Sequence, residues 1–314
     1  MHLGRDNSFT ADSDENMLEH LTTEQRNPAS DQIDSLNSLE IVQLMNAEDA
    51  KIAAAVEKEA TTIAAAIDVI TEAFLQGGRL IYMGAGTSGR LGVLDASECP
   101  PTFNSPPELV VGLIAGGQAA LTNAIEGAED HGESAVADLQ RLNFGKEDVL
   151  VGIATSGRTP YVIAGLQYAR EQGAQTIALT CNQENQLSAV AALTICPVVG
   201  PEVVTGSTRL KAGTATKMVL NMLTTGAMVR VGKTYGNLMV DLRATNQKLV
   251  DRSIRILMAF TDLSRDAAAT VLKDCGGKLK TAIVHVKRNV SPEAADELLS
   301  QAEGHLRRVL EKSE

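Results

Sequence analysis

Residues 79–89 read RLIYMGAGTSG, a short, mostly apolar run followed at once by a loop that contains three glycines. Thr87 and Ser88 add two hydroxyl groups to this loop, and Arg90 follows it. Buried strands of α/β folds typically end in such loops, where backbone N–H groups at the start of the next helix face a ligand. We therefore interpret this stretch as the first strand and first ligand loop of an α/β domain.

Four further apolar runs follow, at residues 109–115 (LVVGLIA), 148–154 (DVLVGIA), 175–180 (QTIALT) and 193–199 (LTICPVV). The segments between them are long enough for crossover helices, which we expect at residues 119–128, 134–142 and 161–172. Apolar runs rich in β-branched residues and separated by helices are typical of a parallel sheet covered on both faces. The pattern predicts a doubly wound five-stranded parallel sheet, with ligand loops at the carboxyl ends of its strands.

Helical patterns flank this core on both sides. Apolar residues recur at helical spacing from Ser38 to Phe74, which predicts two helices broken near Glu48 and Asp49. After Pro201 we expect helices only, at residues 210–231, 244–262, 264–274, 279–287 and 292–310. The predicted organisation is an N-terminal arm (1–37), an α/β domain with flanking helices (38–240) and a helical C-terminal region with a small three-helix module (241–314).

Composition excludes several classes of protein. The 314 residues carry 28 basic and 39 acidic side chains, a formal net charge of −11 and a pI near 5.0. Nucleic-acid binding needs a basic surface, so no nucleic-acid partner is expected. No window offers the roughly 18 apolar residues of a membrane span. The first 30 residues show no signal-peptide pattern, and the four cysteines form no CxxC pair, so we expect a cytoplasmic protein with reduced thiols.

The first loop, residues 84–89, also matches the GxGxxG pattern of dinucleotide-binding proteins. Such proteins usually carry an acidic residue at the end of the second strand to hold the ribose hydroxyls. Here that position reads Ala115-Gly116-Gly117, without a carboxylate. Hydroxyl groups beside helix-terminal amides suit a compact phosphate monoester better than a buried pyrophosphate. We therefore rank a phosphate site above an NAD site.

A second loop, Thr155 to Pro160 (TSGRTP), repeats this composition after the third strand, and Thr205 to Lys211 (TGSTRLK) repeats it before a long helix. Each alone is also explained by ordinary helix capping. Two strand-terminal loops with the same hydroxyl, glycine and arginine content favour one shared anion site. A protein of net charge −11 must concentrate positive charge to bind an anion, and the loops supply Arg90, Arg158, Arg209 and Lys211.

Several longer segments resemble the sugar-isomerase (SIS) domain of the N-acetylmuramic acid 6-phosphate etherases: Ile81–Phe103, Val110–Gly117, Ala124–Glu133, Gly152–Leu166 and Val203–Leu223. The resemblance extends over nearly all of the chain after residue 21, and its most specific parts read DASECPPTF and EGAED. It implies a flavodoxin-like SIS fold and a homodimer that binds a phosphorylated amino sugar close to the subunit interface. It implies no metal and no organic cofactor.

The resemblance also implies a reaction: cleavage of the lactyl ether at C3 of N-acetylmuramic acid 6-phosphate, giving N-acetylglucosamine 6-phosphate and D-lactate during cell-wall recycling. Such an ether is stable near neutral pH, so an activated route is needed. When the sugar ring opens, the C1 aldehyde acidifies the C2 proton, and the lactate oxygen at C3 can leave by β-elimination. Water then adds to C3. Two carboxyl groups can divide the proton transfers.

The residues that match the family's catalytic glutamates are Glu98 and Glu129. We assign Glu98 as the acid that protonates the departing lactate and Glu129 as the C2 base. The resemblance identifies these two residues more firmly than it identifies which of them is the acid and which is the base. Pro100 and Pro101 are expected to end a helix beside Glu98. The resemblance further implies a 6-phosphate held by Thr87, Ser88, Ser156, Gly157 and Thr159 and a substrate carboxylate received by Arg209 or Lys211.

Two alternatives share the predicted fold. An aldose–ketose isomerase would use one glutamate to move a proton between C1 and C2. A non-catalytic phosphosugar sensor, like the glucokinase regulatory protein that shares this architecture, would bind a sugar phosphate without turning it over. Release of D-lactate and exchange of the C2 proton separate the three functions.

Overall fold

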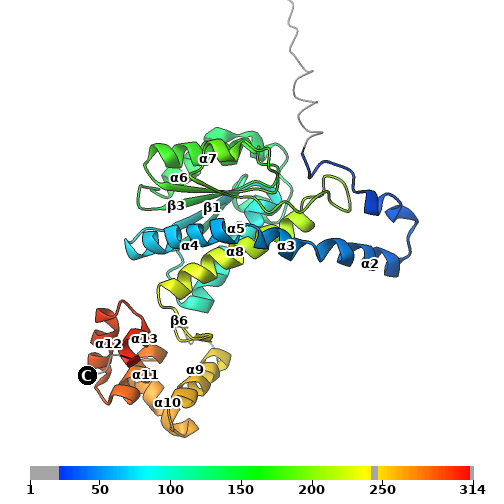
Figure 1. Ribbon diagram of the computed structural model, residues 1–314. Helices are drawn as coiled ribbons and strands as arrows, with labels where there is room; N and C mark the ends of the chain where they lie inside the picture. The colour runs from blue at the N-terminus through cyan, green and yellow to red at the C-terminus, as the bar shows by residue number, and fades with distance from the viewer. Residues whose placement is uncertain (1–20, 242–246, 312–314) are drawn as a thin grey trace, which may run out of the picture.

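The computed structural model describes residues 21–241 and 247–311 (Figure 1). The predicted arm at 1–37, the start of the helix predicted at 244–262 and the last residues of the C-terminal region therefore lie partly outside the described residues. A five-stranded parallel sheet forms the centre of the molecule, with the strand order β2-β1-β3-β4-β5. Its strands lie within the five predicted runs: β1 Leu80–Gly84, β2 Val110–Ile114, β3 Val149–Ile153, β4 Gln175–Leu179 and β5 Leu193–Ile195.

Helices cover both faces of the sheet, which confirms the doubly wound architecture (Figure 1). One face packs against α4 (Ala60–Leu75), α5 (Gly86–Phe103) and α8 (Lys211–Arg230), and the other against α6 (Gly132–Arg141) and α7 (Pro160–Glu171). Alternate residues of each strand supply the two cores: Tyr82 of β1 belongs to one, and Ile81 and Met83 to the other. Burial of this aliphatic surface is the main force holding the layers together.

The segment before the sheet contains two 3₁₀ turns, η1 (Pro28–Ser30) and η2 (Ile33–Ser35), and the helices α2 (Ser38–Asp49) and α3 (Ile52–Glu57). The predicted break near Glu48 and Asp49 is confirmed. Helix α2 extends away from the body of the molecule (Figure 1). Its apolar side chains Leu39 and Val42 are 65% and 62% exposed, so few of the described residues pack against this side of the helix.

The C-terminal region has its own hydrophobic core, built from buried side chains between Val240 and Val309. It begins with a small antiparallel hairpin of β6 (Thr234–Tyr235) and β7 (Leu238–Met239), which the purely helical expectation missed. The helices are α9 (Gln247–Phe260), α10 (Arg265–Asp274), α11 (Leu279–Arg288), α12 (Pro292–Gln301) and α13 (Leu306–Glu311). The single helix predicted at 292–310 is thus broken, because the chain turns at Glu303 and Gly304, both with positive φ.

Two further expectations differ from the structure. Residues 119–128 do not form a crossover helix; the connection contains only the short 3₁₀ helices η3 (Gly117–Leu121) and η4 (Ala128–Asp130). Pro100 and Pro101 do not end α5, which continues to Phe103 and stops at Asn104, with φ +50°. The fixed φ of proline is compatible with helical backbone, and the buried Phe103 ring anchors the last turn. Glu98 therefore lies on a continuous helix and not at a chain reversal.

Candidate active site

The first glycine loop joins β1 directly to α5. A Cβ atom at Gly89 would lie 2.7 Å from both the Gly84 carbonyl oxygen and Cγ1 of Ile114, so only glycine lets the helix begin this close to the sheet. Within the described residues no side chain caps the start of α5. Ser88 is buried and Thr87 half-buried at this helix end. The loop therefore offers amide and hydroxyl donors, which together suit a phosphate group.

The second loop, Thr155–Thr159, leaves the sheet beside the first, because β1 and β3 are neighbours and Gly84 pairs in register with Ile153. Gly157 has φ +73°, and a Cβ there would lie 2.2 Å from Cβ of Asn185. No side-chain hydrogen bond caps α7 in the described part of the chain, where Thr159 is the N-cap residue. The structure thus brings two uncapped helix N-termini to adjacent positions at the carboxyl edge of the sheet.

The buried side chain of Asn182 braces this second loop, a role that our sequence reasoning missed. Its Nδ2 donates to the Thr155 carbonyl oxygen at 2.8 Å and to Thr23 Oγ1 at 3.1 Å. The hydroxyl of Thr180 donates to the same Thr155 carbonyl at 3.1 Å. The available signal was the polar run TCNQEN directly after the fourth strand. Asn182 positions the loop and ties the N-terminal segment to it.

Glu129 lies in a pocket beside the first loop. The pocket has a volume of about 180 Å³, and its lining includes Gly86, Arg90, Asn123, Glu126 and Glu129. Arg90 donates from Nε to the Leu121 carbonyl at 3.0 Å and from Nη2 to the Asn123 carbonyl at 2.9 Å. Its guanidinium therefore holds the segment that carries Glu129 against α5. A carboxylate beside an amide and hydroxyl cradle can accept a proton from a ligand bound by its phosphate.

Glu98 does not share this pocket. It is exposed and lies on α5 twelve residues after Gly86, which at the rise of an α-helix corresponds to about 18 Å. The structure therefore brings Glu129 together with the glycine loop but places Glu98 toward the opposite end of the same helix.

The part of α5 that carries Glu98 is fixed by a buried carboxylate one turn earlier. Asp95 accepts hydrogen bonds from Tyr82 Oη at 3.1 Å, Thr224 Oγ1 at 2.9 Å and Lys217 Nζ at 3.0 Å. These contacts tie α5 to β1 and α8. Burial, with the nearby Asp95 charge, raises the pKa of Cys99 to about 12, so this thiol is protonated at neutral pH. Cys99 packs in the core.

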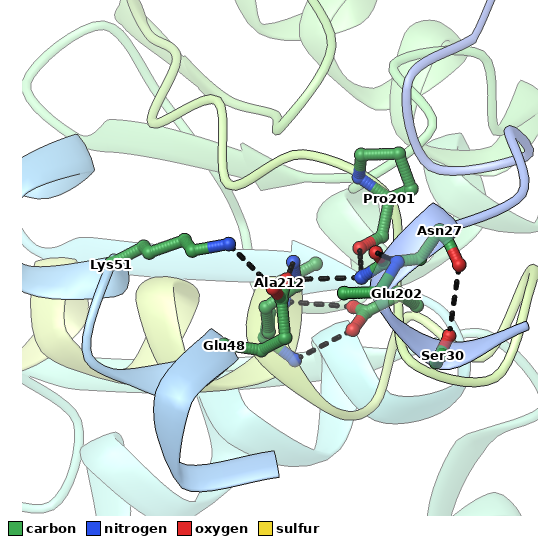
Figure 2. Close-up of polar contacts among 9 residues, drawn as sticks. Asn27, Ser30, Glu48, Lys51, Pro201, Glu202 and Ala212 are labelled. Carbon is green, nitrogen blue, oxygen red and sulfur yellow. Dashed lines mark hydrogen bonds and ion pairs between the residues drawn. The ribbon is translucent and has the colours of Figure 1, made fainter. Parts of the chain in front are cut away.

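The segment before α8 uses its polar groups internally. Glu202 is fully buried and accepts hydrogen bonds from the backbone N–H groups of Lys211 and Ala212, both at 2.9 Å (Figure 2). Lys211 itself is 1% exposed, and its Nζ donates to Glu48 Oε2 at 2.7 Å. Lys211 therefore does not fit the role of receiving a substrate carboxylate, because its charge is already neutralised in the core. Arg209, the other candidate, is exposed.

Glu48 is the centre of this polar cluster. Besides Lys211 it accepts from Lys51 Nζ at 2.5 Å and from Asn27 Nδ2 at 3.0 Å (Figure 2). Burial alone would raise the pKa of Glu48, but the hydrogen bonds from Lys211, Lys51 and Asn27 outweigh it and lower the pKa to about 2. The cluster links the N-terminal segment, the end of α2 and the start of α8.

A larger cavity, of about 600 Å³, lies at the C-terminal region between Asn104 and residues 276–281. Two lysines line it, and both are engaged: Lys280 Nζ donates to Asp241 at 3.0 Å, and Lys278 Nζ to Asp296 at 2.7 Å. We place the site at the glycine loops, where free donors converge. Over residues 21–241 and 247–311, no three His, Cys, Asp or Glu side chains form a metal-binding group, and no helix could cross a membrane.

Two family models agree with this fold. The model of the glucokinase regulatory protein N-terminal SIS domain matches residues 62–170, and the SIS domain model matches residues 127–226. Among solved structures, phosphoheptose isomerase GmhA from Neisseria gonorrhoeae superposes with a TM-score of 0.48 at 20% sequence identity, covering 60% of this chain and 98% of that one.

Full-length relatives are much closer. A protein of Rhodopirellula baltica named N-acetylmuramic acid 6-phosphate etherase is 63% identical over 295 residues, covering 94% of this chain and 98% of the relative. N-acetylmuramic acid 6-phosphate etherase 2 of Vibrio cholerae is 55% identical, covering 95% and 97%. Identity at this level over nearly the whole chain includes the helical C-terminal region as well as the sheet. The chain belongs to the N-acetylmuramic acid 6-phosphate etherase family.

Proposed function

We propose that this protein cleaves the lactyl ether at C3 of N-acetylmuramic acid 6-phosphate, giving N-acetylglucosamine 6-phosphate and D-lactate in cell-wall recycling and amino sugar catabolism. The observation that carries this proposal is the 63% identity to a named etherase over 94% of the chain. The geometry supports it independently, because a carboxylate lines a pocket beside a loop with uncapped helix-terminal amides. A phosphorylated sugar fits that combination.

The substrate phosphate is held by the two neighbouring loops. Thr87 and Ser88 supply hydroxyl groups at the start of α5, and Ser156, Gly157 and Thr159 supply hydroxyl and amide groups at the start of α7. Charge-assisted hydrogen bonds of this kind contribute about 1.5–3 kcal/mol each. Arg209, exposed just before α8, receives the lactyl carboxylate.

The reaction starts from the open-chain sugar. The Glu129 carboxylate removes the C2 proton, and the electron pair left behind forms the C2–C3 double bond as the C3–O bond breaks. The Glu98 carboxyl group gives its proton to the departing lactate oxygen. Water then adds at C3 and a proton returns to C2, which gives the product alcohol and restores both glutamates. Each proton transfer contributes about 10²- to 10⁴-fold to the rate.

The protein works as a cytoplasmic homodimer in this proposal. Residues 38–240 form the phosphosugar-binding domain, preceded by the arm at 1–37 and followed by the helical region at 241–314. Support for the last division comes from the separate hydrophobic core between Val240 and Val309.

The proposal is tested with N-acetylmuramic acid 6-phosphate, by enzymatic assay of D-lactate and by deuterium incorporation at C2 in heavy water. Glu129→Gln is expected to lose both reactions, whereas Glu98→Gln loses lactate release and keeps C2 exchange. Glu171→Gln, at the exposed end of α7, is the matched control and keeps wild-type rates. A wild-type protein that releases no lactate contradicts the function, and full turnover by Glu98→Gln removes that residue from the mechanism.

A further inference from the structure

The pocket that contains Glu129 is too small for a whole phosphorylated amino sugar. Its volume of about 180 Å³ lies below the roughly 300 Å³ at which pockets begin to enclose a complete small-molecule ligand. The substrate therefore places only part of itself here. In the proposed reaction Glu129 removes the proton from C2, so the part that enters the pocket is the C2 end of the sugar.

The distance from the phosphate loops to this pocket is short enough for a hexose. Gly86, at the start of α5, lines the pocket together with Glu129. In an open-chain hexose 6-phosphate, C2 is six covalent bonds from phosphorus, a path of at most about 8 Å. A phosphate bound at the start of α5 can thus deliver C2 to the pocket. C2 carries the acetamido group of the proposed substrate, which must then find room beside Glu129.

Small apolar side chains form one wall of the pocket. The five alanines and one isoleucine that line it are Ala85, Ala115, Ala120, Ala124, Ala128 and Ile125. The Cβ atoms of Ala120, Ile125 and Ala128 face a common point, because each lies 3.3 Å from the position that a Cβ at Gly116 would take. Ile125 is 43% exposed although it is apolar. An apolar wall left open beside Glu129 suits a methyl group of a ligand.

Polar groups of the same pocket match the two polar ends of an amide. Arg90 binds the Leu121 and Asn123 carbonyls through Nε and Nη2, and its Nη1 has no hydrogen-bond partner among the described residues. This nitrogen can donate to an amide carbonyl oxygen. Within the part of the chain that the structure describes, the Glu126 carboxylate has no hydrogen-bond or ion-pair partner, and it can accept from an amide N–H. Donor, acceptor and apolar wall together correspond to an acetamido group.

We propose that this pocket is the subsite for the 2-acetamido group of the substrate. Ala124, Ile125 and Ala128 contact the acetyl methyl group, Arg90 binds the amide carbonyl and Glu126 binds the amide N–H. The inference rests on the proposed function and adds that the apolar wall selects the length of the N-acyl chain. One methylene group in an apolar pocket changes kcat/KM by about 10- to 200-fold, so the wall discriminates an acetyl from a propionyl group.

Two substrates that differ by one methylene group test the proposal: the N-acetyl and the N-propionyl forms of muramic acid 6-phosphate. The measured quantity is the ratio of their kcat/KM values for D-lactate release, propionyl over acetyl. Ile125→Ala widens the pocket and should raise this ratio about tenfold, whereas Ala124→Val narrows it and should lower the ratio by a similar factor. Both side chains are exposed, so the variants are expected to keep the fold.

Ala119→Val is the matched control. Ala119 is exposed in the same connection but does not line the pocket, so this variant should keep the wild-type ratio. A ratio of two rates is insensitive to general damage, which lowers both values of kcat/KM by the same factor. An unchanged ratio in either pocket variant overturns the proposal, as does an equal change in Ala119→Val. Failure of the proposed function looks different, because the wild-type protein then releases no lactate from the N-acetyl substrate.

Discussion

Three helix starts have nearly the same amino-acid composition but differ in how their backbone N–H groups are used. They are the loops at the starts of α5 and α7 and the segment before α8. All three combine glycine, hydroxyl and basic residues around the start of a helix. No side chain caps α5 or α7 among the described residues, whereas Glu202 binds two backbone amides at the start of α8. The backbone N–H groups at a helix start can therefore bind an anionic ligand only where no carboxylate of the protein already accepts their hydrogen bonds.

Lys211, the basic residue at the start of α8, is likewise paired within the protein and not available to a ligand. Lys211 is buried against Glu48, a residue 163 positions earlier in the chain, and so serves the fold. Changes in the buried Glu48–Lys211 pair should accordingly alter stability, and changes in the loops at the starts of α5 and α7 should alter substrate affinity. The predictions below set these two regions against each other.

The largest effect is expected for Glu48→Gln. This substitution leaves the Lys211 ammonium buried without a counter-charge, and breaking such a pair typically costs about 3–5 kcal/mol. The free energy of unfolding, measured by urea denaturation, should fall by that amount. Lys51→Met is the control: Lys51 is largely exposed, so its loss should cost no more than about 1 kcal/mol. Equal losses of unfolding free energy in the two variants would show that the buried Glu48–Lys211 pair contributes no more to stability than the exposed Lys51.

The same pair predicts a pH dependence. The pKa of Glu48 lies at about 2 in the folded protein, below its ordinary value of 4.5, so the folded state binds the proton less tightly than the unfolded chain. This stabilisation, of about 3 kcal/mol, is complete above pH 4.5 and is lost as the pH falls toward 2. The difference in unfolding free energy between wild type and Glu48→Gln should shrink over that interval. A difference that stays constant would contradict the low pKa.

In the two phosphate loops, Ser88→Ala and Ser156→Ala should each weaken substrate binding. A hydrogen bond to a phosphate contributes about 1.5–3 kcal/mol, so its loss should raise KM by about tenfold or more. The double variant should bind the substrate more weakly than either single variant. Ser207→Ala, in the capped segment before α8, provides the comparison and should leave KM unchanged. If KM rises only for Ser207→Ala, the phosphate binds at the third segment.

The smallest effect is expected for Arg209→Gln. An exposed charge contributes at most about 1 kcal/mol to an ion pair, so KM should rise no more than about fivefold at low salt. Since salt screens exposed charges, the difference from wild type should disappear at high ionic strength. A KM effect that persists in high salt would indicate that Arg209 becomes buried on the substrate, contrary to its present exposure.

Much of this molecule follows from local sequence patterns. The five apolar runs, the helices between most of them and the two glycine loops could be predicted, because strand burial and turn chemistry depend on neighbouring residues. The same locality explains the failures. The hairpin at 234–239 packs Tyr235, Leu238 and Met239 against the core of the C-terminal region, and the turn at Glu303 and Gly304 is followed by Leu306 and Val309 of the same core.

In the candidate site, too, some features follow from the local sequence and others depend on tertiary contacts. Residue types and spacing predict an anion site at Thr87, Ser88, Ser156 and Gly157, since each lies within a few residues of the end of a strand. Folding of the whole chain assigned Lys211 to Glu48, closed the α8 terminus with Glu202, and separated Glu98 from Glu129 along the length of α5. Those outcomes depend on contacts between segments remote in the chain, where burial and charge pairing act on positions that no local pattern encodes.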